Sequence, residues 1–329
     1  MTSTTDGPPT WPVVAFGEWV TASAPSVEGL PSVRVNLFRD AASGIETFPP
    51  FLRTIVAYDQ NLLPPFPNAR FVWTARPGLV TLQQMQVVGG EARTRSNQPH
   101  LEQEVLAHEV AHQWWGGLVR PARSEDRWMS ETMATMYACV FVGALFDPKD
   151  CEVRKSTWRD TWEKELTAFD GSVRDAQATS QWVDVAYAYG PYVTLHMLRG
   201  RIGDEAFFGA LDRYARDRVD APATTDRLQA AFEATSGKDL HDFFAWWLVG
   251  GFVPALHLTL DGTSGTLTSD IPFGTFDVPV VVVTNDGEQT LWVDVVDGTG
   301  TFTAPAGTRK VKLDPDGLVL ARTRKVSRR

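Results

Sequence analysis

The hydrophobic and polar positions divide the chain into three stretches of different pattern. The first 90 residues mix proline-rich turns with short apolar or alternating runs that are typical of strands, at residues 33–38, 71–74 and 79–88. From about residue 101 to residue 248, apolar residues recur with the period of a helix, interrupted by glycines and prolines. Beyond residue 250, short β-rich runs separated by Asp-Gly and Gly-Thr-Gly turns predict a small β-sandwich that begins near residue 254.

The 329-residue chain has the composition of a globular protein with a sizeable core. Hydrophobic residues make up 43% of it and charged residues 22%, which excludes extended disorder. Its 31 basic and 40 acidic residues give a formal net charge of -9, so we expect no nucleic acid as a main partner. A cluster of basic residues follows Arg322, and because it has no apolar anchors we interpret it as a solvated end.

Cysteine usage and apolar runs bear on where the protein works. The two cysteines, Cys139 and Cys151, are too few for a disulfide framework, which fits a reducing compartment. No cationic segment followed by an apolar one stands near the first residue, so no signal peptide is predicted. The longest apolar stretches fall short of the roughly 20 residues that a bilayer span needs. We therefore expect a cytoplasmic protein with no membrane partner.

The chemistry of the chain is concentrated in one short motif, His-Glu-Val-Ala-His, which begins at His108 and ends at His112. At about 100° per residue, the two histidines lie about 40° apart on one face of a helix. The apolar residues that would bury this helix form a stripe nearly opposite: Leu106, Val110 and Trp114. Two imidazoles therefore converge on one point, where they can bind a metal ion. The competing explanation is a chance pattern on a charged helix, and the flanking residues disfavour it.

Zinc prefers imidazole nitrogen and carboxylate oxygen in a tetrahedral array, and a catalytic site leaves one position for water. A third protein ligand is therefore required. Glu131 stands nineteen residues after His112, at the start of a second helical run, and a Gly-Gly pair ends the first helix between them. A second, antiparallel helix can bring Glu131 to the metal; for this residue alone, a solvated carboxylate at a helix start is the alternative. Glu109 lies beside the metal-binding face, so it can take a proton from zinc-bound water and pass it to a leaving amine.

Residues 108–119 read His-Glu-Val-Ala-His-Gln-Trp-Trp-Gly-Gly-Leu-Val, and Glu131 follows His112 after eighteen intervening residues. This stretch closely resembles the aminopeptidase N family of gluzincin zinc metallopeptidases, which reads His-Glu-Leu-Ala-His-Gln-Trp-Phe-Gly-Asn-Leu-Val with the same spacing to its ligand glutamate. The resemblance covers roughly residues 30–320. It implies an α+β fold with a thermolysin-like catalytic domain, in which a small mixed sheet is followed by a mostly helical block, and a C-terminal β-sandwich.

The resemblance extends to the approach to the third ligand. Asp126 and Trp128 match the family's Asn-Asp-Leu-Trp segment, although Ser130 and Thr132 replace the Asn and Gly that usually flank the glutamate. Metal-bound histidines usually donate their other N–H to a carboxylate or a carbonyl. Asp126 is therefore a candidate to hold a metal-binding histidine. The alternative interpretation is that Asp126 only stabilises a turn.

A further match lies at residues 187–191, where Tyr-Ala-Tyr-Gly-Pro resembles the family's Tyr-x-Lys-Gly segment. The resemblance gives Tyr187 a catalytic role, in which its phenol hydrogen-bonds the oxyanion of the tetrahedral intermediate opposite the zinc. Tyr189 occupies the family's lysine position, and the sequence assigns it no role. Without the resemblance, core packing is the favoured interpretation of Tyr187.

The chain departs from the family at the site that binds the substrate's amino group. The family's Gly-x-Met-Glu-Asn segment has its best match at residues 83–87, Gln-Gln-Met-Gln-Val. Met85 is retained and Gln86 replaces the glutamate, so these two candidate substrate-binding residues offer a hydrogen-bond acceptor without a charge. Glu91 or Glu104 could substitute from nearby, although each is more simply a surface carboxylate.

The sequence thus predicts four segments: a remnant N-terminal β segment (1–40), a thermolysin-like zinc metallopeptidase domain (41–253), a β-sandwich (254–322) and a basic tail (323–329). Most of the family's large N-terminal β-domain is expected to be missing, and a protein partner could stand in its place. The predicted function is hydrolysis of peptide substrates with one Zn²⁺ per chain, as an aminopeptidase. The alternatives are an endo- or oligopeptidase and a non-catalytic, zinc-stabilised protein that binds peptides.

Overall fold

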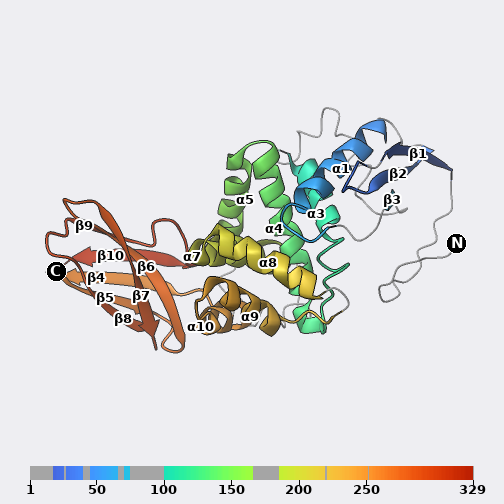
Figure 1. The fold of residues 1–329 in the computed structure, drawn as a ribbon. Coiled ribbons are helices and arrows are strands. Elements are labelled where there is room, and N and C mark those ends of the chain that lie inside the picture. Colours follow the sequence, from blue (N-terminus) through green and yellow to red (C-terminus); the bar gives the residue numbers. More distant parts are fainter. Residues whose placement is uncertain are drawn as a thin grey trace. The chain divides into compact units, whose positions relative to one another are not determined.

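A computed structural model describes residues 18–25, 27–39, 45–65, 70–74, 100–165, 185–218, 221–250 and 252–328 (Figure 1). The described residues divide into two compact units. The first unit is drawn from residues 1–122, 133–154 and 211–223, and the second from residues 123–132, 155–210 and 224–329. The predicted strand at residues 79–88 lies outside the described residues.

The small mixed sheet that the sequence predicts near the N-terminus is present in the first unit. Its strands are β1 (Trp19–Ala24), β2 (Ser32–Phe38) and β3 (Arg70–Thr74). They lie in the order β1-β2-β3, with β1 antiparallel and β3 parallel to β2. Val33, Val35 and Leu37 alternate along β2 and are buried, as expected for a strand with one face on a core. Helix α1 (Phe48–Asp59) follows the 3-10 turn Ile45–Thr47 and packs on this sheet.

The predicted helical block is confirmed. Its α-helices are α3 (Leu101–Ala111), α4 (Trp128–Leu145), α5 (Pro148–Asp160), α7 (Arg199–Ile202), α8 (Asp204–Arg218), α9 (Thr225–Ser236) and α10 (His241–Phe243). Within the described ranges, four segments have π-helical hydrogen bonding: η5 (Thr161–Glu165), η7 (Val185–Tyr189), η8 (Tyr192–Leu198) and η9 (Phe244–Gly250). The 3-10 turn η4 (Ser124–Asp126) precedes α4. No helix among the described residues is both long and apolar enough to cross a bilayer.

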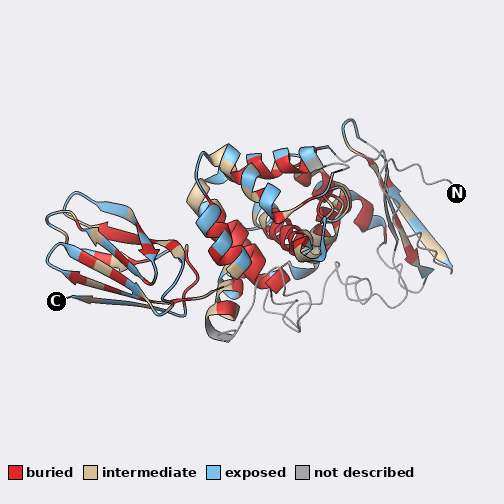
Figure 2. Ribbon diagram, turned by 90° about the horizontal axis from the view of Figure 1, so that it is seen from below, coloured by how far each residue is buried: buried red, intermediate tan, exposed pale blue. Residues whose placement is uncertain are grey.

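Helix α4 is buried around most of its circumference. Every residue from Thr132 to Cys139 is buried, which is typical of a helix in the core of a domain. Figure 2 shows buried residues in red along many of the helices. Within the first unit, the ring of Phe141 meets the edges of Phe51 and Tyr58 from α1. These contacts fix the position of α4 in its surroundings.

A disulfide between Cys139 of α4 and Cys151 of α5 also lies in the first unit. Two cysteines separated by twelve positions carry no framework pattern, so the sequence does not predict this pairing. Disulfides persist in oxidising compartments. The cysteines therefore give no support to the expected cytoplasmic location, which stays a prediction.

The second unit ends in a sheet of seven strands. They are β4 (Ala255–Asp261), β5 (Ser264–Ser269), β6 (Thr275–Val283), β7 (Glu288–Val296), β8 (Thr299–Thr303), β9 (Lys310–Leu313) and β10 (Thr323–Arg328). Their order is β10-β4-β5-β8-β7-β6-β9. Strands β9 and β10 stand at opposite ends of this order and yet touch. The sheet therefore folds back on itself, and it buries Leu258, Leu267, Val280 and Val295 in the manner of the expected β-sandwich.

The basic segment after Arg322 differs from its prediction as a solvated end. Residues 323–328 form β10, which pairs in parallel with β4. Backbone hydrogen bonds to β4 do not depend on apolar side chains. In addition, Arg324 finds buried partners, so the absence of apolar anchors does not leave this segment without structure.

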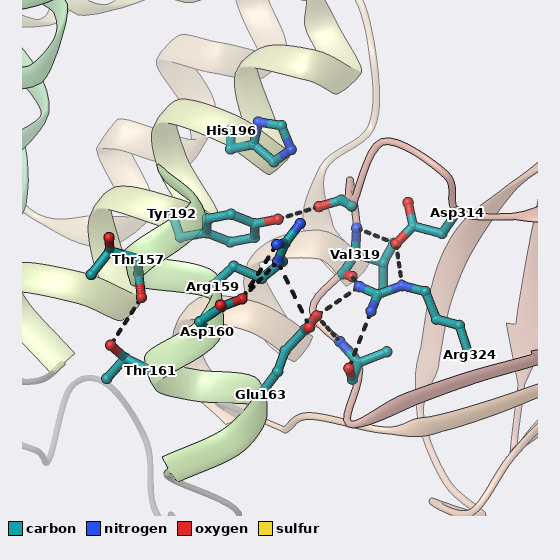
Figure 3. A network of polar contacts seen from close by, with 12 residues as sticks. Thr157, Arg159, Asp160, Thr161, Glu163, Tyr192, His196, Asp314, Val319 and Arg324 are labelled. Atoms are coloured by element: carbon teal, nitrogen blue, oxygen red, sulfur yellow. Dashed lines mark hydrogen bonds and ion pairs between the residues drawn. The ribbon is translucent and has the colours of Figure 1, made fainter. Parts of the chain in front are cut away.

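Arg324 is the centre of a polar network in the second unit (Figure 3). Its guanidinium donates to Glu163 at 2.7 Å and to Asp314 at 2.9 Å, and the side chains of both acids are nearly or fully buried. Burial raises the pKa of the Asp314 carboxyl, while Arg324 and the backbone amides of Leu318 and Val319 act in the opposite direction. The network thus ties η5 to the strand β10 and to the turn that precedes it.

We predict that Arg324→Ala lowers the free energy of unfolding by about 3 kcal/mol, because it leaves the buried carboxylate of Asp314 without its cation and removes one of the two arginines that pair with Glu163. Chemical denaturation monitored by circular dichroism measures the change. Arg322→Ala is the matched control, since Arg322 pairs with Asp270 at the surface and such pairs contribute about 1 kcal/mol or less. If both variants lose the same free energy of unfolding, the Arg324 network contributes no more than a surface ion pair.

Candidate metal centre

Helix α3 presents the two motif histidines as the sequence predicts. Leu106, Val110 and Trp114 are all at most 1% exposed, which confirms the buried stripe. His108 lies in the last turn of α3, and His112 is its C-cap residue. The opposite face of α3 is thereby anchored in the core, and both imidazoles share the remaining face.

Each of the two rings makes a polar contact at Nδ1, and the two Nε2 atoms lie on the side of the ligand group. Nδ1 of His112 lies 3.0 Å from the carbonyl oxygen of Trp115. A carbonyl only accepts, so Nδ1 carries the proton and Nε2 has a lone pair. Nδ1 of His108 lies 3.2 Å from the hydroxyl of Thr135 on α4. The two Nε2 atoms face each other at 3.0 Å.

Glu131, in the first turn of α4, completes the cluster. His108, His112 and Glu131 each offer one ligand atom, and these atoms all lie within 4.8 Å of one another. Two nitrogen lone pairs at 3.0 Å repel unless a cation or a proton lies between them. Two imidazoles and a carboxylate are also a donor set that divalent transition metals accept. The residues present therefore fit a metal ion.

Thr135 is a member of this centre that the sequence analysis missed. It stands four residues after Glu131, so both side chains project from the same face of α4. Its hydroxyl holds the ring of His108 from the side away from the other ligands. The signal that could have found it is this spacing, because a polar residue one turn beyond a ligand reaches the ligand's neighbours.

Tyr187, in η7, lies beside the third ligand. Its hydroxyl donates a hydrogen bond of 2.7 Å to Oε2 of Glu131. The side chain is 39% exposed, so its phenol is accessible from solvent. Within the second unit, the structure thus brings Tyr187 to Glu131, as expected for two residues of one site.

Tyr189, at the family's lysine position, has a structural role. It is fully buried, it donates to the carbonyl of Trp247 at 2.6 Å, and its ring meets the edge of Trp162. Burial raises the pKa of its phenol well above the ordinary value. Tyr189 therefore stays protonated and packs in the core of the second unit.

Asp126 does not hold a metal-binding histidine, and that expectation is corrected. Its carboxylate is fully buried and accepts from the amide and the hydroxyl of Thr225, at 2.8 and 2.9 Å, and from Arg123. Trp115 and Thr135 occupy the position beside each imidazole instead. Asp126 anchors the turn that leads into α4, which agrees with the alternative interpretation of Asp126 as a turn residue.

The remaining candidates divide between described and undescribed positions. Glu109 is partly buried on α3, next to His108. Glu104 is not a surface carboxylate that could bind an ammonium group, because it is buried and ion-paired with Arg154. Burial raises the pKa of Glu104, and Arg154 counteracts this effect. The candidates Met85, Gln86 and Glu91 lie outside the described residues.

The fold and this cluster are those of a metallopeptidase, and comparisons with known proteins agree. A family model for the peptidase family M1 domain matches residues 61–247, more than half of the chain. The chain therefore belongs to peptidase family M1, which confirms the resemblance to aminopeptidase N.

Several known proteins are similar to this chain over part of their length. The chain is 26% identical over 203 residues to the Tricorn protease-interacting factor F2 of Thermoplasma acidophilum, covering 57% of this chain and 26% of that protein. It is 31% identical over 180 residues to aminopeptidase N of Lactococcus lactis, covering 52% and 21%. The chain thus matches about a quarter of the length of these relatives.

A solved structure shares the fold. The aminopeptidase A of Legionella pneumophila, in complex with aspartic acid, superposes with a TM-score of 0.69 at 14% identity. The similarity covers 93% of this chain and 38% of that one. At this identity the likeness supports the fold, and the α+β architecture expected from the sequence is confirmed.

We predict that Thr135→Val weakens metal binding by about tenfold or more, because His108 loses the partner that orients its ring. Competition with a chelating dye, with Zn²⁺ as the probe, measures the dissociation constant. Thr235→Val is the matched control, since the Thr235 hydroxyl bonds a carbonyl of its own helix. A dissociation constant within twofold of the wild type would remove Thr135 from the metal centre.

Proposed function

We propose that this chain carries the active site of a zinc-dependent peptide hydrolase of the aminopeptidase type. The observation that supports this most strongly is the approach of His108, His112 and Glu131 to one point, with Tyr187 donating to Glu131. A three-ligand site leaves a coordination position for water or substrate, as catalytic zinc sites do. A closed structural site would show a fourth protein ligand, and none joins this group among the described residues.

His108, His112 and Glu131 would hold the zinc. When bound, zinc supplies a Lewis acid that polarises the scissile carbonyl and lowers the pKa of water toward about 7. The hydrogen bonds at Nδ1 of each histidine keep both Nε2 atoms directed at one point. The chain thus prepares the ligands before the metal arrives, which limits the cost of ordering them on binding.

Glu109 is the proposed proton carrier. It is the residue after His108, so it lies at the edge of the metal-binding face of α3 without joining the ligand group. Its carboxylate accepts a proton from the attacking water and later delivers that proton to the leaving amine. One carboxylate therefore serves both halves of the reaction.

Tyr187 is the proposed donor to the developing oxyanion. Its phenol already donates toward the ligand group, through Oε2 of Glu131, at 2.7 Å. The phenol has a single donor hydrogen, which would turn from Oε2 of Glu131 to the oxyanion, and a phenol that is already held beside the ligand group needs little reorganisation to do so. Its 39% exposure leaves the phenol accessible to a peptide that enters from solvent.

The family and the sequence of residues 83–87 support the proposed substrate class. Relatives named aminopeptidases favour removal of N-terminal residues. Gln86 in place of the family's glutamate weakens the anchor for a free α-ammonium group, which favours an endo- or oligopeptidase as the second candidate. Two relatives are named as factors that interact with the Tricorn protease, and a protein partner of this chain stays a prediction.

A set of peptides, half with free and half with acetylated N-termini, tests the proposal when incubated with the zinc-loaded protein. Cleavage sites are mapped by mass spectrometry with and without a zinc chelator. We expect chelator-sensitive release of single residues from free N-termini. Equal cutting of acetylated peptides would instead support the endo- or oligopeptidase, and no cleavage by zinc-loaded protein would support a non-catalytic peptide-binding protein.

We predict that Glu109→Gln lowers kcat by about 10²-fold to 10⁴-fold, the range for loss of a general base, and leaves one zinc per chain. Steady-state kinetics and metal analysis of the same preparation measure the two quantities. Glu125→Gln is a control, because Glu125 pairs with Arg123 and is not proposed to act in the reaction. Full activity of the Glu109 variant would eliminate the proposed base.

A further inference from the structure

Helix α4 and the segment η7 make two adjacent polar contacts within the second unit. The hydroxyl of Tyr187 donates to Glu131. The hydroxyl of the next residue of α4, Thr132, donates to the carbonyl of Ala186 at 3.2 Å, in a buried position. Two neighbouring residues of one element thus bond two neighbouring residues of the other.

The carbonyl of Ala186 lies in the π-helical segment η7. The amide five residues ahead, which a continued π-helical pattern would use, belongs to Pro191 and has no hydrogen. The buried hydroxyl of Thr132 donates to this carbonyl from another element, and buried carbonyls are stabilised by such donors.

The surroundings of Thr132 are shaped to admit its side chain. A Cβ added at Gly190 would stand 2.1 Å from Oγ1 of Thr132, and the three heavy atoms nearest to it all belong to Thr132. The glycine therefore leaves space that the threonine fills. The family has a glycine at the position of Thr132, so this interlocking pair is a feature of the present chain.

The direction of the Thr132 hydroxyl is also informative. Threonine in a helix commonly bonds a carbonyl of its own preceding turn, as Thr194 does with Gly190. Thr132 instead bonds a carbonyl of another element. That carbonyl belongs to the residue directly before Tyr187, so the bond fixes the backbone from which the phenol projects.

We propose that Thr132 is a positioning residue for Tyr187. Its hydroxyl holds the carbonyl of Ala186, and this fixes η7 so that the phenol of Tyr187 meets Oε2 of Glu131. The expected effect on catalysis rests on the proposed function. The expected effect on the distance between the Tyr187 hydroxyl and Oε2 of Glu131 does not depend on it.

The variant Thr132→Val removes the hydroxyl and keeps the shape of the side chain. We expect kcat to fall by about tenfold to a hundredfold, because a displacement of about 1 Å at a reacting group has an effect of this size. KM should change by less than about twofold and zinc content should not change. Thr132→Ser, which keeps the hydroxyl, should restore most of the activity, and Thr194→Val is the matched control at a buried threonine.

A double-variant cycle separates positioning from general damage. In a Tyr187→Phe background the phenol is gone, so Thr132→Val should cause little further loss of kcat. A full additional loss would show that Thr132 acts independently of Tyr187 and would overturn the proposal. A crystal structure of Thr132→Val supplies a readout other than activity, in which the bond between Tyr187 and Glu131 should be lengthened or lost. An unchanged bond would also overturn it.

The pairing of Thr132 with Gly190 gives a second test that depends on folding alone. Gly190→Ala should lower the thermal midpoint, because its Cβ would overlap Oγ1 of Thr132. Thr132→Gly has a cost of its own, so the comparison is a double-mutant cycle: Gly190→Ala should cost less stability in a Thr132→Gly background than in the wild type, because the glycine restores space. If Gly190→Ala costs the same in both backgrounds, the two residues do not interlock and the proposal fails. If the wild type cleaves no peptide, the proposed function fails, and the crystal structure and this stability test still decide the geometry.

Discussion

The site depends on one contact, the approach of the Nε2 atoms of His108 and His112 to 3.0 Å. Each ring is held from behind at Nδ1, by the carbonyl of Trp115 and by the hydroxyl of Thr135. The rings therefore cannot turn their lone pairs away without breaking those bonds. Two lone pairs at this distance repel each other, and either a metal ion or a shared proton between the two Nε2 atoms relieves that repulsion. It follows that metal binding and the stability of this part of the fold are coupled, because the ion favours the folded arrangement that it completes.

Helix α4 satisfies several requirements of the site from a single buried element. Its first two turns carry Glu131, Thr132 and Thr135, which are respectively the third ligand, the donor to η7 and the partner of His108. A helix that is buried around most of its circumference tolerates hydroxyls only where they find partners. Both threonines bond outside their own helix, so each polar position also fixes a neighbour. Rigid packing along the rest of α4 then holds these side chains in constant relation to one another.

The sequence could predict those features that depend on short separations. Helical periodicity placed the two histidines on one face, a spacing of nineteen residues brought Glu131 within reach of His112, and alternation identified the strands. The motif also indicated Asp126, but the predicted partner, a metal-binding histidine, was wrong. The partner in the structure is Thr225, which lies 99 positions away, and no local sequence pattern indicates that contact. The same limit applies to Arg324, whose partner Glu163 is 161 positions distant. Composition describes such a residue as a solvated cation, and only the tertiary structure shows that it is half-buried and paired.

The fixed spacing between the motif and the third ligand has a physical origin in the connection between α3 and α4. A tight turn forms where Gly116 adopts φ 103°, a left-handed conformation that favours glycine. Beyond it, the amide of Ala122 bonds a carbonyl of the segment after α8, and the carboxylate of Asp126 bonds the first residue of α9. The segment between α3 and α4 is thus held at separate points, at Ala122 and at Asp126. An extra residue in this segment would displace at least one of these contacts. One inserted residue between Asp126 and Glu131 would turn the glutamate by about 100° around the helix and remove it from the imidazoles. The count of eighteen intervening residues is therefore set by these contacts as much as by the ligands themselves.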